Sequence, residues 1–147
     1  MKIIFICLGN ICRSPMAEYL FKDMLDKNRI KGVEVTSRGT SDEEEGNPIH
    51  YGTRRVLDRL GIDSSRHRAK KITKKECGEA DLLIVMEDGN VRWLESICGA
   101  ENKRKIKKLL DFTTRGGNIA DPWYTHDFVT CYNDISEGLQ GLLEYIS

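Results

Sequence analysis

"IFICLGNICRSP", residues 4–15, passes from an apolar run to a short polar loop and ends in Ser-Pro. The β-branched apolar run over residues 2–7 is typical of a strand buried inside a parallel sheet. Pro15 is tolerated in the first turn of a helix, so we expect a helix that begins at Ser14. The stretch therefore predicts a strand, a tight loop and a helix in direct succession. Its two cysteines, Cys7 and Cys12, raise four alternatives: a structural disulfide, a metal site, a phosphate-binding loop or a catalytic thiol.

The chain of 147 residues has the size of one domain, so we expect a single domain over residues 1–147. Hydrophobic residues make up 39% and charged residues 31%, which indicates a globular protein. Lysine plus arginine and aspartate plus glutamate balance at 23 each, so the charge favours neither nucleic acid nor an anionic membrane as a partner. The N-terminal apolar stretch is too short for a signal peptide, and no later run could span a bilayer. These features predict a cytoplasmic protein.

The cysteines show no scaffold pattern. Their number is odd, and they are thinly spread: Cys7, Cys12, Cys77, Cys98 and Cys131. There is no Cys-x-x-Cys pair, and the three histidines are not at ligand spacing, so no metal site is expected. Cytosolic thiols stay reduced, which favours a reactive cysteine over a structural disulfide. We expect Cys77, Cys98 and Cys131 to be small apolar residues.

Strand and helix patterns alternate along the chain. Short apolar runs predict strands over residues 2–7, 33–37, 82–86 and 105–110. Helical spacing predicts helices over 14–29, 49–60 and 87–97, then a long loop through 115–124 and a closing helix from Phe128. The alternation predicts an α/β fold: a single three-layer domain, with a four-stranded parallel sheet, helices on both faces and a phosphate-binding loop after the first strand. Ligands bind such sheets at the carboxyl ends of the strands, where residues 7–14 would lie.

A loop between a strand and a helix N-terminus is a common anion site. Its backbone N–H groups point inward, and the helix end adds partial positive charge. Gly9 and Asn10 are residue types that tolerate the positive φ of such a loop. The Gly-Lys-[Ser/Thr] ending of a nucleotide-binding Walker A loop is absent. The pattern therefore favours a phosphate-binding loop of another kind.

This loop also holds a thiol and a guanidinium. Inward-pointing N–H dipoles favour the thiolate form of Cys7, and Ser14 could donate a hydrogen bond to it. The planar fork of Arg13 matches two phosphate oxygens, which a lysine could not do. A thiolate held below a phosphoryl group is a nucleophile aligned for displacement. The Cys-x5-Arg-Ser pattern favours this interpretation over a buried strand-end cysteine beside an exposed arginine.

Two motifs resemble those of a known family. "CLGNICRSPMAE", residues 7–18, resembles the signature loop of the low-molecular-weight protein tyrosine phosphatases, and "DPWY", residues 121–124, resembles their Asp-Pro-aromatic-aromatic loop. The resemblance implies hydrolysis of phosphotyrosine through a phosphocysteine intermediate, without metal or cofactor. Cys7 would be the nucleophile, Arg13 the phosphate clamp, and Asp121 the general acid and then base. The phosphate-binding loop would comprise Leu8, Gly9, Asn10, Ile11, Cys12 and Ser14.

The resemblance also assigns supporting roles. Asn10, Ser14, Ser37 and His67 would form a hydrogen-bond network that holds the loop in place, because loosely held donors bind phosphate less well. Cys12 would be the redox partner of Cys7. A disulfide between these two cysteines would protect the thiolate from irreversible oxidation. An acid is needed on chemical grounds too, since a positioned carboxylic acid accelerates loss of a phenolate by about 10²–10⁴-fold.

Substrate preference depends on the residues around the slot. Trp123 and Tyr124 would wall it and offer flat surfaces to a phosphotyrosine ring, with Leu8 and Ile11 at its floor and entrance. The acidic run "DEEE", residues 42–45, brings Glu43 near the entrance, where many relatives carry an apolar or aromatic residue. We therefore expect faster turnover of phosphotyrosine peptides with basic flanks.

Two further positions depart from the family pattern. Arg38 stands where a small residue is usual, between Ser37 and Gly39, and Glu87 replaces a common aspartate after the central strand. These departures leave the expected mechanism intact.

Two alternative activities remain at this point. Related protein-arginine phosphatases carry threonine at the position of Ile11, and isoleucine favours phosphotyrosine. Thioredoxin-coupled arsenate reductases need a further cysteine pair, but Cys77 and Cys98 lack the close spacing expected for it. The expected partners are phosphotyrosine proteins, with a tyrosine kinase among the candidates. We expect a monomer, with weak self-association as the alternative.

Overall fold

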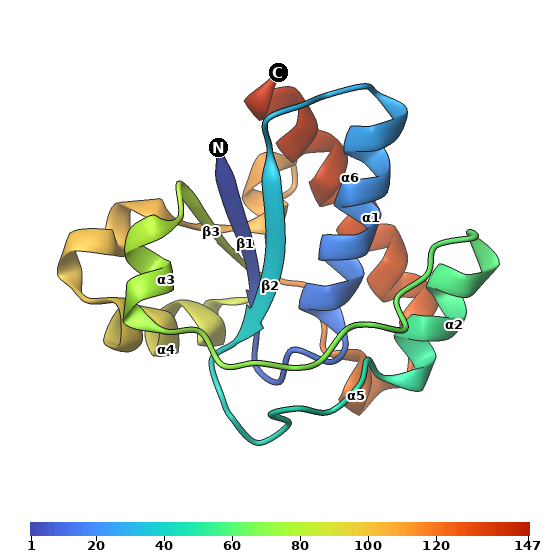
Figure 1. Ribbon diagram of the computed structural model, residues 1–147, viewed down its shortest axis with the longest axis horizontal. Helices are drawn as coiled ribbons and strands as arrows, with labels where there is room; N and C mark the ends of the chain where they lie inside the picture. Colours follow the sequence, from blue (N-terminus) through green and yellow to red (C-terminus); the bar gives the residue numbers. More distant parts are fainter.

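The computed structural model describes residues 1–147 and has a four-stranded parallel sheet at its centre (Figure 1). The strand order is β2-β1-β3-β4, with β1 Lys2–Cys7, β2 Glu34–Gly39, β3 Leu82–Val85 and β4 Ile106–Lys108. β1 pairs with β2 on one side and β3 on the other. An interior strand of a parallel sheet is covered on both faces, which explains why β1 is apolar along its length.

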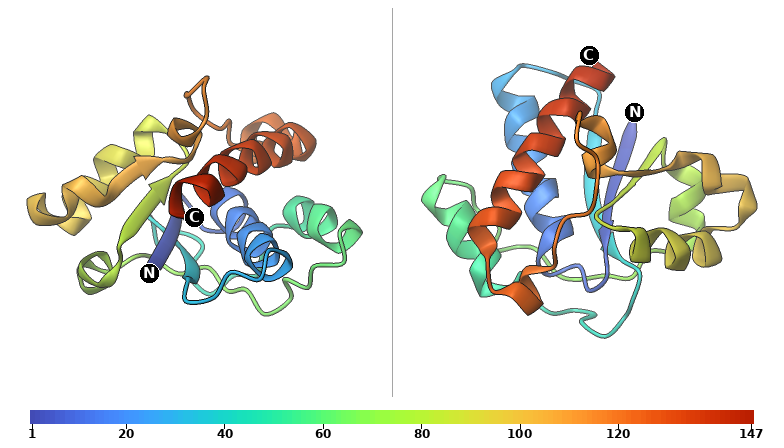
Figure 2. Two further views of the ribbon diagram at one scale, coloured as in Figure 1. Left: turned by 90° about the horizontal axis from the view of Figure 1, so that it is seen from above. Right: turned by 180° about the vertical axis from the view of Figure 1, so that it is seen from behind.

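Helices cover both faces of this sheet (Figure 2). α1 (Arg13–Lys27) and α6 (Phe128–Ile146) pack on one face, and α3 (Lys74–Glu79) and α4 (Asp88–Cys98) on the other. α2 contacts both α1 and α6. The remaining helical elements are α2 Tyr51–Arg59, α5 Pro122–Thr125, η1 Ala100–Lys105 and η2 Leu109–Phe112. None of these helices combines the length and the apolar character that crossing a membrane requires.

Alternate residues of β1 contribute to the two halves of the core. Ile3, Phe5 and Cys7 join the apolar cluster beneath α1 and α6, whereas Ile4 and Ile6 join the cluster beneath α3 and α4. This alternation is the two-residue period of a strand. It places Cys7 at the carboxyl end of β1, on the side of the sheet covered by α1.

The predicted fold class is confirmed, and each predicted strand and helix is present: the first strand has the predicted bounds, and the other elements have shifted ends. The helix expected over 14–29 is Arg13–Lys27, and the strand expected over 105–110 is only Ile106–Lys108. The loop expected through 115–124 ends in the short helix α5. α3 was not predicted, because its one buried side chain gives it no helical periodicity.

The expectation that Cys77 and Cys98 are unpaired is wrong. A disulfide joins Cys77 of α3 to Cys98 at the end of α4, with 5.6 Å between their Cα atoms. Both residues are fully buried among the apolar side chains of the α3 and α4 face. They are 21 residues apart in the sequence, and the fold alone brings them together. Cys131 is free and buried in the other core cluster, as expected of a small apolar residue.

Candidate active site

The site is built around the loop between β1 and α1, residues 8–12, at the carboxyl end of the sheet. Asn10 has φ 59°, in the left-handed region that asparagine tolerates better than most residues. Gly9 does not have positive φ, so that part of the expectation is wrong. Gly9 instead lies against the acidic segment, since a Cβ atom there would be 3.3 Å from Glu44 Cγ.

The Cys7 thiol lies at the mouth of this loop and contacts two polar groups. The backbone N–H of Asn10 donates to Cys7 Sγ at 3.3 Å, and Ser14 Oγ lies 3.0 Å from the same sulfur. Asn10 Nδ2 donates to Ser14 Oγ at 2.8 Å, so the hydroxyl proton of Ser14 remains available to the sulfur. Both groups can donate to the sulfur and so stabilise a negative charge that develops on it.

The Asn10 side chain joins three segments that are far apart in the sequence. Its Nδ2 also donates to Ser37 Oγ at 3.0 Å, at the end of β2. Its Oδ1 accepts from the backbone N–H of Lys70 at 3.0 Å. Ser37 Oγ in turn donates to Glu18 Oε1 of α1 at 2.6 Å. The amide is thereby held in one orientation, and the loop with it.

His67 holds the same loop through its backbone. Its Nε2 lies 2.7 Å from the carbonyl oxygen of Asn10, and because that oxygen can only accept, Nε2 carries a proton. Burial lowers the pKa of His67, although the bond to Asn10 and the nearby Glu18 oppose the shift. The ring is therefore neutral at pH 7, protonated at Nε2 alone.

Arg13 is almost fully buried at the start of α1, and most of its donors are already used. One terminal nitrogen (Nη1) pairs with Glu87 and donates to the carbonyl oxygen of Ile119 at 2.9 Å; the other (Nη2) donates to Asp121 Oδ2 at 3.3 Å. Burial alone would lower the pKa of Arg13, but Cys7, Asp121 and Glu87 raise it. Nε and one Nη2 hydrogen have no protein partner, and together they form a two-pronged fork that matches two oxygens of a phosphate.

Asp121 is brought to Arg13 by the start of α5. Its Oδ1 accepts from the backbone N–H of Trp123 at 3.0 Å, so it caps this helix, and Pro122 occupies the first helical position. Its Oδ2 faces Arg13. The cap thus fixes one carboxylate oxygen and leaves the other directed at the site.

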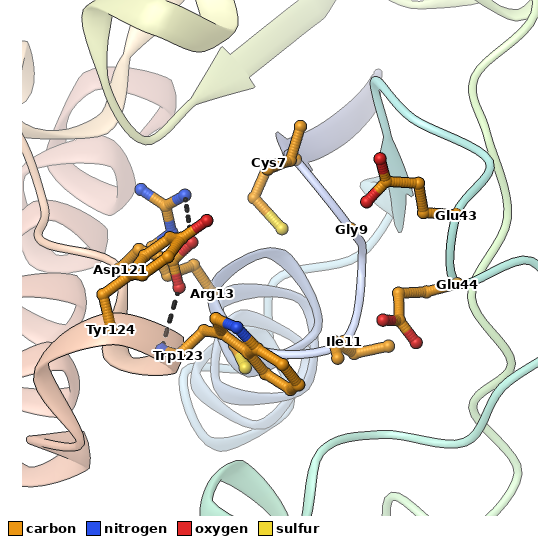
Figure 3. A pocket seen from close by; sticks show the side chains of 11 residues that line it. Cys7, Gly9, Ile11, Arg13, Glu43, Glu44, Asp121, Trp123 and Tyr124 are labelled. Atoms are coloured by element: carbon orange, nitrogen blue, oxygen red, sulfur yellow. Dashed lines mark hydrogen bonds and ion pairs between the residues drawn. The ribbon is translucent and has the colours of Figure 1, made fainter.

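These groups line one pocket of about 130 Å³ (Figure 3). The Arg13–Asp121 pair lies on one side of Cys7, and Glu43 and Glu44 lie on the other. Trp123 and Tyr124 form a wall and are 51% and 72% exposed, so their rings are open to an incoming ligand. The lining residues are Cys7, Leu8, Gly9, Ile11, Cys12, Arg13, Glu43, Glu44, Asp121, Trp123 and Tyr124.

Cys12 lines the same pocket, but its surroundings differ from those of Cys7. It is a free, buried cysteine just before α1. Burial raises its pKa strongly, and the neighbouring Cys7 and Asp121 raise it further. Cys12 is therefore a neutral thiol at pH 7.

The structure brings the predicted site residues together around one pocket and its supporting network. Sequence reasoning missed Glu18 and His50, it named Glu44 only as part of the acidic run, and it gave Glu87 no contact with Arg13. Glu18 lies one helical turn after Ser14, a spacing that many unrelated helices share. His50 contacts Trp123 edge to face, with 5.6 Å between ring centroids, and no sequence motif marks it.

Comparisons with known proteins agree with this geometry. The family model described as "Low molecular weight phosphotyrosine protein phosphatase" matches residues 2–147. The low molecular weight protein-tyrosine-phosphatase YfkJ of Bacillus subtilis is 36% identical over 99% of this chain and 96% of its own length. PtpA of Staphylococcus haemolyticus, also named as such a phosphatase, is 34% identical over 99% of this chain and 94% of its own. The crystal structure of YfkJ superimposes with a TM-score of 0.95, covering 99% of this chain and 94% of the other. This chain belongs to the low-molecular-weight phosphotyrosine protein phosphatase family.

Proposed function

We propose that this protein hydrolyses phosphotyrosine on other proteins through a phosphocysteine intermediate. The observation that carries this proposal is the convergence of the Cys7 thiol, the Arg13 guanidinium and the Asp121 carboxylate on one pocket with an aromatic wall. The names of the relatives support the same reaction class.

In the first step, the Cys7 thiolate attacks phosphorus. The S–P bond forms as the bond between phosphorus and the tyrosine oxygen breaks. Asp121, as a carboxylic acid, gives its proton to that oxygen from Oδ2, which faces the site beside Arg13, whereas Oδ1 caps α5 through the N–H of Trp123. The free fork of Arg13 and the N–H groups of the loop bind the phosphoryl oxygens, whose charge they stabilise in the transition state.

In the second step, water attacks the phosphorus of phosphocysteine. The Asp121 carboxylate takes one proton from this water, the S–P bond breaks, and inorganic phosphate and the Cys7 thiolate are released. The hydroxyl of Ser14, 3.0 Å from the sulfur, stabilises the departing thiolate. The protein thus returns to its starting state.

Phosphotyrosine fits the pocket better than the alternatives do. Trp123 and Tyr124 offer rings for stacking, and Ile11 gives the lining an apolar side chain without a hydroxyl, which argues against phosphoarginine. Arsenate reduction would need a cysteine pair that reaches Cys7. Cys77 and Cys98 are bonded to each other and buried on the opposite face of the sheet.

Cys12 is proposed as a redox guard. A peroxide would oxidise the Cys7 thiolate to a sulfenic acid, and the Cys12 thiol would condense with it, forming a disulfide and releasing water. A Cys12→Ser variant should then lose activity irreversibly in peroxide, whereas a thiol reductant should restore the wild type. Equal recovery of both proteins would contradict the role.

The proposed partners are cytoplasmic proteins that carry phosphotyrosine, with a tyrosine kinase among the candidates, and the proposed acting form is a monomer. Glu43 and Glu44 face the pocket on the side away from Asp121, and basic residues beside the phosphotyrosine would lie against them. At low salt, we expect a higher kcat/KM for phosphotyrosine peptides with basic flanks than for those with acidic flanks. This preference should be smaller in Glu43→Gln. It should be unchanged in Asp42→Asn, which alters the same loop outside the pocket. Equal values for both peptides would remove this preference.

The reaction itself is tested by hydrolysis of p-nitrophenyl phosphate with a metal chelator present. Cys7→Ser should abolish turnover, and Asp121→Ala should lower kcat by about 10²–10⁴-fold. Ser37→Ala, which leaves the reacting groups in place, serves as the folded control with a smaller loss. Retained turnover in Cys7→Ser would overturn the mechanism. Parallel assays with phosphotyrosine and phosphoarginine distinguish the two substrate classes.

A further inference from the structure

A groove between α2 and the start of α6 has no part in the chemistry described above. Its volume is about 450 Å³, and it shares no lining residue with the catalytic pocket. Figure 1 shows α2 beside α5, the helix that carries the aromatic wall of the pocket. Aromatic and basic side chains dominate its lining: His50, Tyr51, Arg55, Arg59 and Phe128.

The contact between the rings of His50 and Trp123 separates the groove from the pocket. His50 stacks on Phe128, with 5.0 Å between ring centroids, and also contacts Trp123 edge to face. Trp123 lines the pocket and His50 lines the groove, so the two hollows lie on either side of one aromatic contact. A peptide whose phosphotyrosine enters the pocket could therefore continue directly into the groove.

The groove has two arginines, Arg55 and Arg59, that form no ion pair with a carboxylate of the protein. Arg55 donates to the Tyr51 hydroxyl at 2.8 Å and lies over the Tyr51 ring, and it has no acidic partner. Arg59, one helical turn further along α2, has no hydrogen-bond or ion-pair partner. Arg54, on the same helix but outside the groove, pairs with Asp58 at 3.7 Å.

Asp127 is the single acidic residue in the lining, and its carboxylate pairs with neither arginine. Asp127 Oδ1 accepts from the backbone N–H of Thr130 at 2.9 Å, and Oδ2 accepts from its hydroxyl at 2.6 Å. Asp127 is thus occupied as the N-cap of α6. The two guanidinium groups are left to an external anion.

We propose that this groove binds an acidic residue of the substrate, close in sequence to the phosphotyrosine, and that Arg55 and Arg59 recognise its carboxylate. This inference rests on the proposed function. Residues four apart on a helix have Cβ atoms about 5–6 Å apart, so both guanidinium groups can reach one carboxylate. The Tyr51 ring and hydroxyl hold the Arg55 fork in place, which reduces the entropy lost on binding. With Glu43 on the other side of the pocket, the protein selects a substrate that is basic on one flank and acidic on the other.

The test measures kcat/KM for phosphotyrosine peptides in which one aspartate is moved through the positions on each side of the phosphotyrosine, in an uncharged background. Aspartate at one or two positions on one side should raise kcat/KM about fivefold at low salt, as two exposed ion pairs would. The double variant Arg55→Gln/Arg59→Gln should lose this gain. Arg54→Gln is the matched control and should keep it.

Hydrolysis of p-nitrophenyl phosphate separates this inference from the proposed function, because it needs the pocket and not the groove. All variants should hydrolyse it at the wild-type rate; an inactive wild type would refute the proposed function instead. A flat aspartate scan, or an equal loss of selectivity in Arg54→Gln, would overturn the groove assignment. A third result would also overturn it: sedimentation shows a wild-type dimer that dissociates in the double variant, while the double variant keeps the aspartate selectivity. The groove would then hold a second copy of the chain.

Discussion

Asn10 has a left-handed backbone conformation, with φ 59°, and its side-chain amide contacts Ser14, Ser37 and Lys70. Asn10→Ala removes these contacts and strains the backbone, so we expect it to lower the free energy of unfolding by about 3 kcal/mol. Asn10→Gly loses the same contacts but accepts this φ, and should be more stable than the alanine variant by about 1 kcal/mol. Both should lower kcat. Urea unfolding and p-nitrophenyl phosphate kinetics measure the two effects, and equal stability of the two variants would contradict the backbone argument.

His67 makes stability depend on pH in a defined direction. Its pKa is lowered by burial in the folded state, so at mildly acidic pH the unfolded chain binds a proton that the folded protein excludes. Its contribution to stability is therefore complete above about pH 6.5, the ordinary histidine value, and declines as the pH falls below it. In His67→Gln, which keeps a donor for Asn10, the melting temperature should fall less between pH 7 and pH 5 than in the wild type. Parallel melting curves of the two proteins would refute this assignment.

α3 is held by two bonds to segments far from it in the sequence. The Cys77–Cys98 disulfide joins it to α4, and Glu76 of α3 pairs with Arg38 of β2 at 2.9 Å, next to Ser37 of the active-site network. The helix is six residues long, too short to be stable by itself. The disulfide and the ion pair thus connect the helices α3 and α4 to β2, whose Ser37 belongs to the hydrogen-bond network that holds the catalytic loop.

Reduction of this disulfide should therefore destabilise the protein. Because the two cysteines are 21 positions apart in the sequence, chain entropy predicts a loss of about 3 kcal/mol. The measurement compares melting with and without a thiol reductant in a Cys7→Ser/Cys12→Ser background, which removes the active-site thiols. A Cys77→Ala/Cys98→Ala variant in that background is the control and should not respond to reductant. An unchanged melting temperature in the parent background would contradict the role of the disulfide.

For the molecule as a whole, sequence patterns predicted the sheet and the layers, because burial gives strands and long helices a periodic sequence. They also singled out Cys7, Arg13 and Asp121 as candidates, since the motifs that hold them are local, and the three side chains line one pocket. What they missed depends on the tertiary fold. The Cys77–Cys98 disulfide joins two short segments on different helices, and the groove beside Arg55 exists only where α2 meets α6.

In the proposed mechanism, Cys7 carries the phosphoryl group between the two steps. The most direct measurement mixes the protein with p-nitrophenyl phosphate, quenches with acid within one turnover, and locates the added phosphoryl group by peptide mass spectrometry. We expect one phosphoryl group per chain on Cys7, absent in Cys7→Ser and longer-lived in Asp121→Ala, where water lacks its base. Turnover without a covalent phosphoryl group, or a phosphoryl group on another residue, would contradict the proposed mechanism.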